Sequence, residues 1–145
     1  VSIGMALGLK LKKSSSRVFC LMSDGELDEG SNWEAFLSGA HNKLDNLIAI
    51  VDRNRLQSIE DTEKTLSLEP LMEKLLSFNW SVSIVDGHNH EQIFYSLNCD
   101  DQIKPKLIIA NTTKGKGVSF MENQVSWHYK SPSTEELLKA KGELN

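Results

Sequence analysis

Two short polar loops, each after an apolar run, carry side chains suited to binding a divalent cation. Asp24-Gly25 follows the run 17–22, and Asn54 follows the run 47–51. Carboxylate and amide oxygens are hard ligands of the kind that Mg²⁺ or Ca²⁺ binds. Gly25 would let the backbone approach a phosphate closely. We therefore expect Asp24 and Asn54 to face one cleft that holds a cation and a phosphate group. Asp-Gly and Asn are also common in simple turns, which is the alternative.

The last third of the chain holds a second group of candidates. Segment 114–117 reads Lys-Gly-Lys-Gly, a loop with two glycines for mobility and two lysines that attract anions, although an ordinary basic turn has the same composition. His128 is the best candidate for general acid–base chemistry, because imidazole is neutral near pH 7 and easily protonated. A lone histidine can equally be structural. His88 and His90 indicate a turn at a helix start rather than a metal site.

Strands and helices must alternate along the chain to position these residues. Four apolar runs predict strands at 17–22, 47–51, 81–85 and 107–110. The runs are nearly continuous in apolar residues, which is typical of strands buried on both faces. The segments between them are long enough for crossover helices. We predict an α/β fold with a largely parallel β-sheet flanked by helices on both faces. Ligands bind outside the carboxyl ends of such strands.

Several side chains are expected in defined structural roles. The aromatic residues expected in the core are Trp33, Phe36, Trp80 and Phe94. Cys20 and Cys99 are far apart, which favours two small buried apolar residues in a reducing compartment. Pro70 suits the first turn of a helix, and Ser133 or Thr134 suits the cap of the last one.

Composition excludes several classes of protein. The chain has 145 residues, 39% of them hydrophobic, which is enough for one domain with its own core. Sixteen basic and 20 acidic residues give a net charge of −4, which argues against nucleic-acid or anionic-membrane binding through bulk charge. No apolar run approaches the roughly 20 residues of a membrane span. Together with the unpaired cysteines, the acidic charge favours a cytoplasmic protein.

An ordered series of motifs resembles one enzyme family. Asp24-Gly25 followed by Asn54 resembles the thiamine diphosphate motif, a Gly-Asp-Gly triplet with a later Asn. The surrounding sequence is similar to the cofactor-diphosphate-binding domain of transketolase. The matching segments are SDGELDEGSNWEA, IVDRNRLQSIEDTEK, LSLEPL, VDGHN, TTKGKGVSFMEN and WHYK. They cover nearly the whole chain, which implies that residues 1–145 form a single, incomplete diphosphate-binding domain truncated at its start.

The resemblance implies a cofactor, thiamine diphosphate, and a metal, Mg²⁺, for which Ca²⁺ could substitute. Asp24 and Asn54 would bind the metal through their side chains, and Leu56 through its backbone carbonyl. Gly25 would bring its N–H group to the diphosphate of the coenzyme. Lys114 matches a lysine near the cofactor.

The resemblance also implies catalytic and substrate-binding residues. Glu29 and Glu34 match acidic residues that are buried near the subunit interface and couple paired active sites, and Glu29 would also help to bind the cofactor. Both flank a helix start, where the helix dipole alone would stabilise a carboxylate. His128 matches the active-site histidine that contacts the donor carbonyl or substrate hydroxyls. Lys130 would bind the substrate phosphate as a point charge.

Two positions depart from the family pattern, and one domain is absent. Ser23 replaces the first Gly of the triplet, and Tyr129 replaces the usual Gly after the active-site histidine. The family's second domain binds the aminopyrimidine and supplies the glutamate that activates the coenzyme. We therefore expect the partner to be a pyrimidine-binding domain or subunit, in a homo-oligomer such as a dimer or in a heterotetramer. We expect no activity from this chain alone.

The resemblance implies transfer of a two-carbon ketol unit from a ketose phosphate to an aldose phosphate, as in the pentose phosphate pathway. One alternative is another thiamine diphosphate enzyme, such as deoxyxylulose phosphate synthase or a 2-oxoacid dehydrogenase component. The other alternative is a non-catalytic remnant that binds a partner protein or the coenzyme without turnover.

Overall fold

Four parallel strands form one sheet in the order β1-β2-β4-β3. The computed structural model describes residues 1–99 and 103–144. The strands are β1 (Val18–Ser23), β2 (Leu47–Arg53), β3 (Ser81–Asp86) and β4 (Lys106–Asn111). Each extends slightly beyond its apolar run, because the polar residues at its carboxyl end still pair with the neighbouring strand, as Ser23 does with Asp52. The predicted parallel sheet is confirmed.

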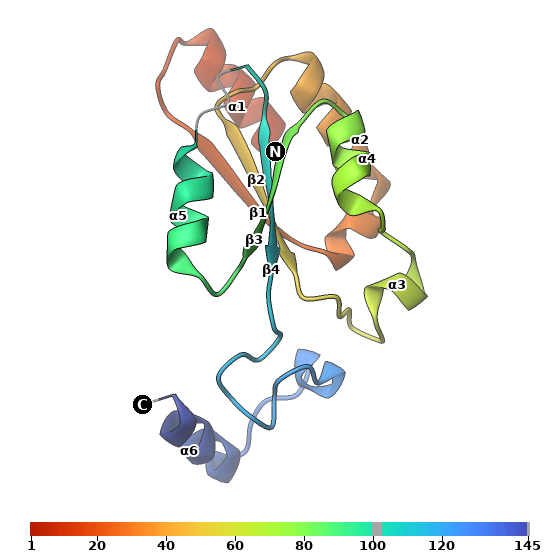
Figure 1. Cartoon of the computed structure of the whole chain (residues 1–145), viewed down its shortest axis with the longest axis vertical. Coiled ribbons are helices and arrows are strands. Elements are labelled where there is room, and N and C mark those ends of the chain that lie inside the picture. The colour runs from red at the N-terminus through yellow and green to blue at the C-terminus, as the bar shows by residue number, and fades with distance from the viewer. Residues whose placement is uncertain (100–102, 145) are drawn as a thin grey trace.

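Helices cover both faces of the sheet (Figure 1). Helices α1 (Ser2–Leu11), α2 (Gly30–His41) and α4 (Leu71–Ser77) lie on one face, and α5 (His90–Asn98) lies on the other. The larger core cluster includes the side of β2 that carries Leu47, Ala49 and Val51. The smaller cluster, under α5, includes Ile48 on the opposite side. This alternation follows from the two-residue period of a strand.

Aromatic residues fill the larger cluster. Trp80 is 1% exposed, donates its Nε1–H to the carbonyl oxygen of Phe36 at 2.8 Å, and meets the Phe36 ring edge-on at 5.3 Å between centroids. Trp33 packs beside them. The prediction for Phe94 is wrong, because that side chain is 69% exposed. Ile93 packs against the sheet from α5, and the next residue points about 100° further round the helix.

Helix ends follow the local sequence. Ser133 caps α6 (Thr134–Glu143) in a capping box with Glu136, as expected. Pro70 directly precedes α4 instead of lying in its first turn. Both thiols are free, and Cys20 is half-buried. The prediction of a buried Cys99 is wrong: it is exposed, because it follows the last residue of α5.

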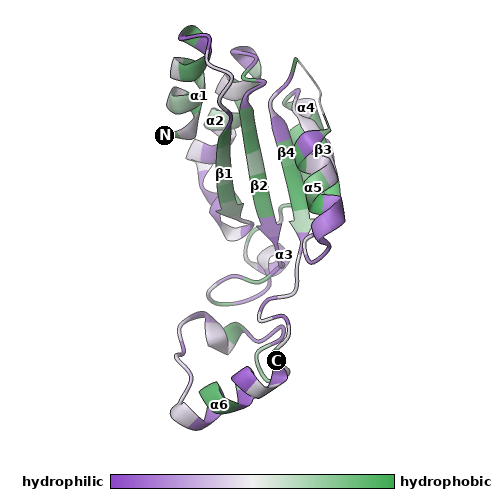
Figure 2. Cartoon of the chain, turned by 90° about the vertical axis from the view of Figure 1, so that its left-hand side faces the viewer, coloured by the Kyte–Doolittle hydropathy of each residue, from purple (hydrophilic) through white to green (hydrophobic). Residues whose placement is uncertain are grey.

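Residues 112–144 leave the sheet at the carboxyl end of β4 and form an arm (Figure 2). The arm packs on itself. Trp127 donates its Nε1–H to the carbonyl oxygen of Phe120 at 2.9 Å, and Glu143 of α6 accepts from the backbone N–H of Ser119 at 2.5 Å. The arm contains the short 3₁₀ helix η2 (Val125–His128), which returns His128 to the strand ends. No helix in residues 1–99 or 103–144 is long and apolar enough to cross a membrane.

The connection after β2 is held together by one carboxylate. It contains the short helix α3 (Thr62–Thr65). Glu63 accepts hydrogen bonds from Ser67 Oγ at 2.7 Å and from the backbone N–H groups of Leu68 and Glu69 at 3.3 Å each. Partial burial alone would raise the pKa of Glu63, but these bonds and one from Arg53 outweigh it and lower the pKa to about 2.

Removal of the Leu75 side chain tests the packing of α4. Leu75 is fully buried, whereas its neighbour Leu76 is 46% exposed. We expect Leu75→Ala to lower the free energy of unfolding by about 2–5 kcal/mol through lost burial and a residual cavity. Leu76→Ala, the matched control, should change it by less than about 1 kcal/mol. Urea unfolding followed by tryptophan fluorescence measures both, and equal losses would contradict this packing.

Acid should remove the contribution of Glu63 to stability. The unfolded-state pKa of a glutamate is about 4.3, so lowering it in the fold stabilises the protein above that pH. The stabilisation is lost as the pH falls from about 4.5 towards 2. Glu63→Gln should therefore be clearly less stable than wild type at pH 7, and the difference, measured by urea unfolding, should shrink steadily as the pH falls from about 4.5 to about 2. Glu60→Gln, the matched control, removes only an exposed pair with Lys64 and should change the free energy of unfolding at pH 7 by less than about 1 kcal/mol.

Candidate functional site

A cavity of about 440 Å³ lies at the carboxyl ends of the strands. It is lined by residues from the turn after β1, the loop after β2 and the arm. The predicted site residues that line it are Gly25, Glu29, Asn54, Leu56, Lys114 and His128. Strands β1 and β2 are direct neighbours, so their loops meet, as the sequence prediction required.

Asp24 lies fully buried beside this cavity, at the start of the 3₁₀ helix η1 (Gly25–Asp28). Its Oδ2 accepts from the backbone N–H of Arg55 at 2.6 Å and from Arg53 Nη1 at 3.1 Å. Its Oδ1 is buried with no hydrogen-bond partner in the described part of the chain. Burial raises the pKa of Asp24, against the hydrogen bonds from Arg55 and Arg53. A buried carboxylate oxygen that lacks a donor is costly, and a bound cation would satisfy it.

The loop after β2 wraps around Asp24. Arg55 has a φ of 67°, a left-handed conformation that turns its N–H group towards the Asp24 carboxylate. Asn54 Oδ1 accepts from the backbone N–H of Leu56 at 3.0 Å, an Asx turn that fixes the amide. An amide oxygen has a second lone pair, so this contact leaves room for a further ligand. The turn thus places Asn54 and Leu56 together in the cavity wall.

The turn after β1 is packed tightly. A Cβ atom at Gly25 would lie 3.2 Å from Cγ of Gln57, so glycine allows the two loops to approach each other. Gln57 in turn donates to Asp28 Oδ2 at 2.6 Å. Ser23 adds a contact that a glycine could not make: its hydroxyl donates to Glu26 Oε2 at 3.2 Å, beside the backbone N–H, which donates to the same oxygen at 2.7 Å.

His128 stands at the open rim of the cavity. Lys114 Nζ lies 3.4 Å from its Nδ1, and Ser58 Oγ lies 3.3 Å from its Nε2. The imidazole therefore sits between a cation and a hydroxyl, where it can exchange hydrogen bonds with a bound molecule. The Lys114 loop is itself positioned by His88, whose Nε2 accepts from the backbone N–H of Thr113 at 2.8 Å.

Besides Asp24, which is buried beside the cavity, two predicted residues do not line it. Lys130 pairs with Glu136 Oε1 at 2.7 Å and lies over the Trp127 ring at 4.1 Å. Glu34 is exposed on α2. Glu29, which does line the cavity, is exposed as well, so neither glutamate is buried within this chain.

The sequence analysis missed Arg53, which is 2% exposed and contacts Asp24. The pattern of residues along β2 could have indicated that Arg53 is buried. Leu47, Ala49 and Val51 alternate on the buried face of β2, and the two-residue period continues to Arg53. A charged residue on that face must find buried partners, and an aspartate at the end of the adjacent strand is the natural one.

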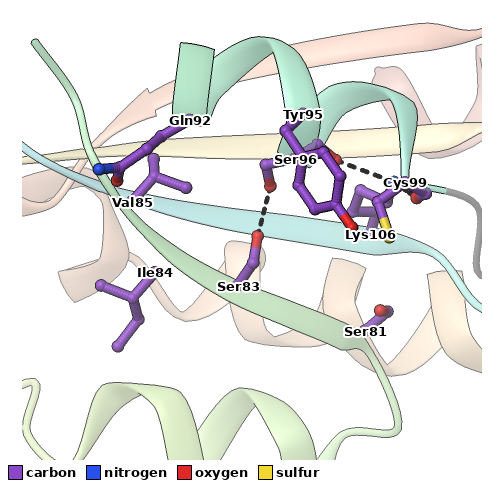
Figure 3. A pocket seen from close by; sticks show the side chains of 9 residues that line it. All are labelled: Ser81, Ser83, Ile84, Val85, Gln92, Tyr95, Ser96, Cys99 and Lys106. Carbon is purple, nitrogen blue, oxygen red and sulfur yellow. Dashed lines mark hydrogen bonds between the residues drawn. The ribbon is translucent and has the colours of Figure 1, made fainter. Parts of the chain in front are cut away.

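A second cavity, about 520 Å³, lies between β3 and α5 (Figure 3). The Ser83 and Ser96 hydroxyls that line it bond to each other at 2.5 Å, and Lys106 Nζ donates to the carbonyl oxygen of Ser96 at 3.0 Å. These polar groups have partners, unlike Asp24 Oδ1. The cavity beside Asp24 is therefore the better candidate for a cation and an anionic ligand.

Comparison with known proteins places the chain in a family. A family profile described as "Transketolase, thiamine diphosphate binding domain" matches residues 10–144. An apulose-4-phosphate transketolase subunit of Phocaeicola vulgatus is 42% identical over 100% of this chain and 52% of its own length. A 6-deoxy-6-sulfo-D-fructose transketolase subunit of a Clostridium species is 38% identical over 96% of this chain and 51% of its own. The chain thus spans about half the length of these curated relatives.

Larger transketolases match as well. Human transketolase is 41% identical over 88% of this chain and 20% of its own length. The crystal structure of transketolase from Campylobacter jejuni superimposes with a TM-score of 0.92 at 29% identity, covering 99% of this chain and 24% of that one. The sequence match and the shared fold agree: the chain belongs to the transketolase family, within its thiamine diphosphate-binding domain.

Proposed function

We propose that this chain supplies the metal- and diphosphate-binding half of the thiamine diphosphate site of a transketolase-type enzyme. The enzyme would move a two-carbon ketol unit from a ketose phosphate to an aldose phosphate. One observation carries the proposal: the fully buried Asp24 has an oxygen without a hydrogen-bond partner in the described chain, beside a cavity at the carboxyl ends of β1 and β2.

Three residues would hold Mg²⁺, or Ca²⁺ in its place. Asp24 would contribute Oδ1, Asn54 its side-chain oxygen and Leu56 its backbone carbonyl. All are oxygen donors, as hard cations require, and a cavity of about 440 Å³ leaves room for water and phosphate oxygens to complete the coordination.

The anionic part of the cofactor would lie against Gly25 and Lys114. Gly25 and Lys114 both line the cavity, and Lys114 brings a positive charge from the arm. Glu29 borders the same space. When bound, thiamine diphosphate supplies the carbon nucleophile that breaks and forms carbon–carbon bonds.

His128 would act on the substrate. It is exposed at the rim, so a sugar oxygen can reach it, and it can donate or accept a proton there. Lys130 would add positive charge beside the rim, and would contact a substrate phosphate only after release from Glu136. Tyr129 stacks edge-on against His128 at 4.7 Å between centroids and is 79% exposed, so it narrows the approach to the imidazole.

A second polypeptide or domain would complete the enzyme. The two bacterial relatives above are named as subunits, which supports a partner subunit for this chain. We propose that the partner binds the pyrimidine end of the cofactor and that this chain has no activity without it. Glu29 and Glu34 would lie at the interface between subunits, where their exposed carboxylates could be covered.

Titration calorimetry tests the cofactor site. We expect the chain to bind thiamine diphosphate only when Mg²⁺ is present, and Asp24→Asn to weaken that binding about tenfold or more, which corresponds to about 1.4 kcal/mol. Asp86→Asn is the matched control, because Asp86 ends a different strand and is exposed. Equal affinity in Asp24→Asn and wild type, with circular dichroism showing both folded, would refute the proposed metal site.

Donor specificity tests the reaction. In the presence of a pyrimidine-binding subunit, we expect a ketose phosphate to serve as donor and pyruvate not to. His128→Asn should lower kcat/KM for the ketose phosphate by roughly 10²–10⁴-fold and leave the cofactor affinity unchanged, because the residue acts on substrate. His90→Asn, at the start of α5, is the control. Turnover of pyruvate instead would assign the chain to another class of thiamine diphosphate enzyme.

A further inference from the structure

We infer that Arg53 is a positioning residue that fixes the metal-binding orientation of Asp24 and is itself held by the segment 62–69. The inference rests on the proposed function, since it concerns how the cation ligand is presented. It adds a residue and a segment that lie outside the cavity lining.

Each terminal nitrogen of the Arg53 guanidinium contacts two oxygen atoms, whereas its buried Nε has no hydrogen-bond partner in the described chain. Its Nη1 lies 3.1 Å from Asp24 Oδ2 and 2.6 Å from Thr62 Oγ1. Its Nη2 lies 2.6 Å from Glu63 Oε1 and 3.0 Å from Glu69 Oε1. Because the guanidinium is a rigid planar fork, the partners on Nη2 determine where Nη1 points.

The fork determines which oxygen of Asp24 remains available. Oδ2 accepts from Arg53 and from the backbone N–H of Arg55, so the carboxylate cannot rotate without breaking two hydrogen bonds. Oδ1 is left without a partner in the described chain. The arrangement presents one oxygen, in one orientation, to a cation.

Two glutamates offset the charge of Arg53. A guanidinium next to a cation site would repel the cation, and the carboxylates of Glu63 and Glu69 on the far side reduce this repulsion. Glu69 is anchored in turn, because its Oε2 accepts from the backbone N–H of Leu71 at 2.9 Å. A continuous chain of hydrogen bonds therefore connects the start of α4, through the segment 62–69 and Arg53, to Asp24.

A positioning role and a purely electrostatic role predict different results for Arg53→Lys. If Arg53 acted only through its charge, a lysine in its place would leave cation binding nearly unchanged. If it orients Asp24, its removal weakens cation binding. Arg53→Lys keeps the charge and loses the fork, so the positioning role alone predicts an effect there.

Mn²⁺ binding measured by electron paramagnetic resonance provides the test. The free Mn²⁺ signal would be titrated against the whole chain in the presence of thiamine diphosphate. We expect Arg53→Lys and Arg53→Met to weaken Mn²⁺ binding by roughly 10–100-fold, the usual cost of losing a residue that orients a metal ligand. Glu60→Gln is the control, because Glu60 pairs with Lys64 on the surface of the same loop.

A charge-neutral variant keeps the test decisive if the Arg53 variants fail to fold. Thr62 is fully buried and accepts from Arg53 Nη1. Thr62→Val removes that acceptor without changing charge, and should weaken Mn²⁺ binding about threefold or more, as expected for the loss of one orienting hydrogen bond. Thr62→Ser restores a hydroxyl and should restore the affinity.

The outcomes separate this inference from the proposed function. If wild type fails to bind Mn²⁺, or if Asp24→Ala binds it equally well, the proposed metal site falls and this inference with it. If Asp24→Ala abolishes binding while folded Arg53 or Thr62→Val variants bind as tightly as wild type or more tightly, only the inference is overturned. Weaker binding in these variants with recovery in Thr62→Ser supports it.

Discussion

The site depends on one buried ion pair, between Arg53 and Asp24. Burying two charges costs several kcal/mol per ion, and the cost is offset only when further hydrogen bonds surround the pair. Arg53 obtains them from Thr62, Glu63 and Glu69, and Asp24 from the backbone of Arg55. Two polar atoms of the pair have no hydrogen-bond partner in the described chain, Arg53 Nε and Asp24 Oδ1. A cation could satisfy only the second, because a carboxylate oxygen is a suitable ligand for a hard cation.

The same pair links the sheet to the loops. Strands β1 and β2 are adjacent and parallel, with Ser23 opposite Asp52, so the residues that follow the two strands meet at the carboxyl end of the sheet. If another strand lay between β1 and β2, the loops that carry Asp24 and Asn54 would be separated by the width of that strand. The buried face of β2 that packs against α1, α2 and α4 ends in Arg53, so the core and the site share one continuous row of side chains.

Sequence alone was sufficient for the parallel sheet and for the meeting of the loops that carry Asp24 and Asn54. Long apolar runs identify buried strands, and the chemistry of Asp24 and Asn54 suggests a cation once their loops are expected to meet. The predictions that Phe94 and Cys99 are buried were wrong, because the hydrophobicity of a residue does not show on which face of a helix it lies or whether it falls just beyond the helix end. The other partners of Arg53, which are Thr62, Glu63 and Glu69, could not be foreseen, since they come from a largely irregular segment without a hydrophobic periodicity.

The part of the candidate site that lies on the arm, residues 112–144, is expected to be less stable locally than the part that lies on the sheet. Its hydrogen bonds and aromatic contacts are largely its own, so it can open without disrupting the sheet core. The buried strand ends that carry Asp24 and Arg53 would then open only together with the sheet, whereas the region of His128 would exchange its amide protons through smaller openings. The buried floor of the candidate site thus shares the stability of the sheet, and its rim opens more easily.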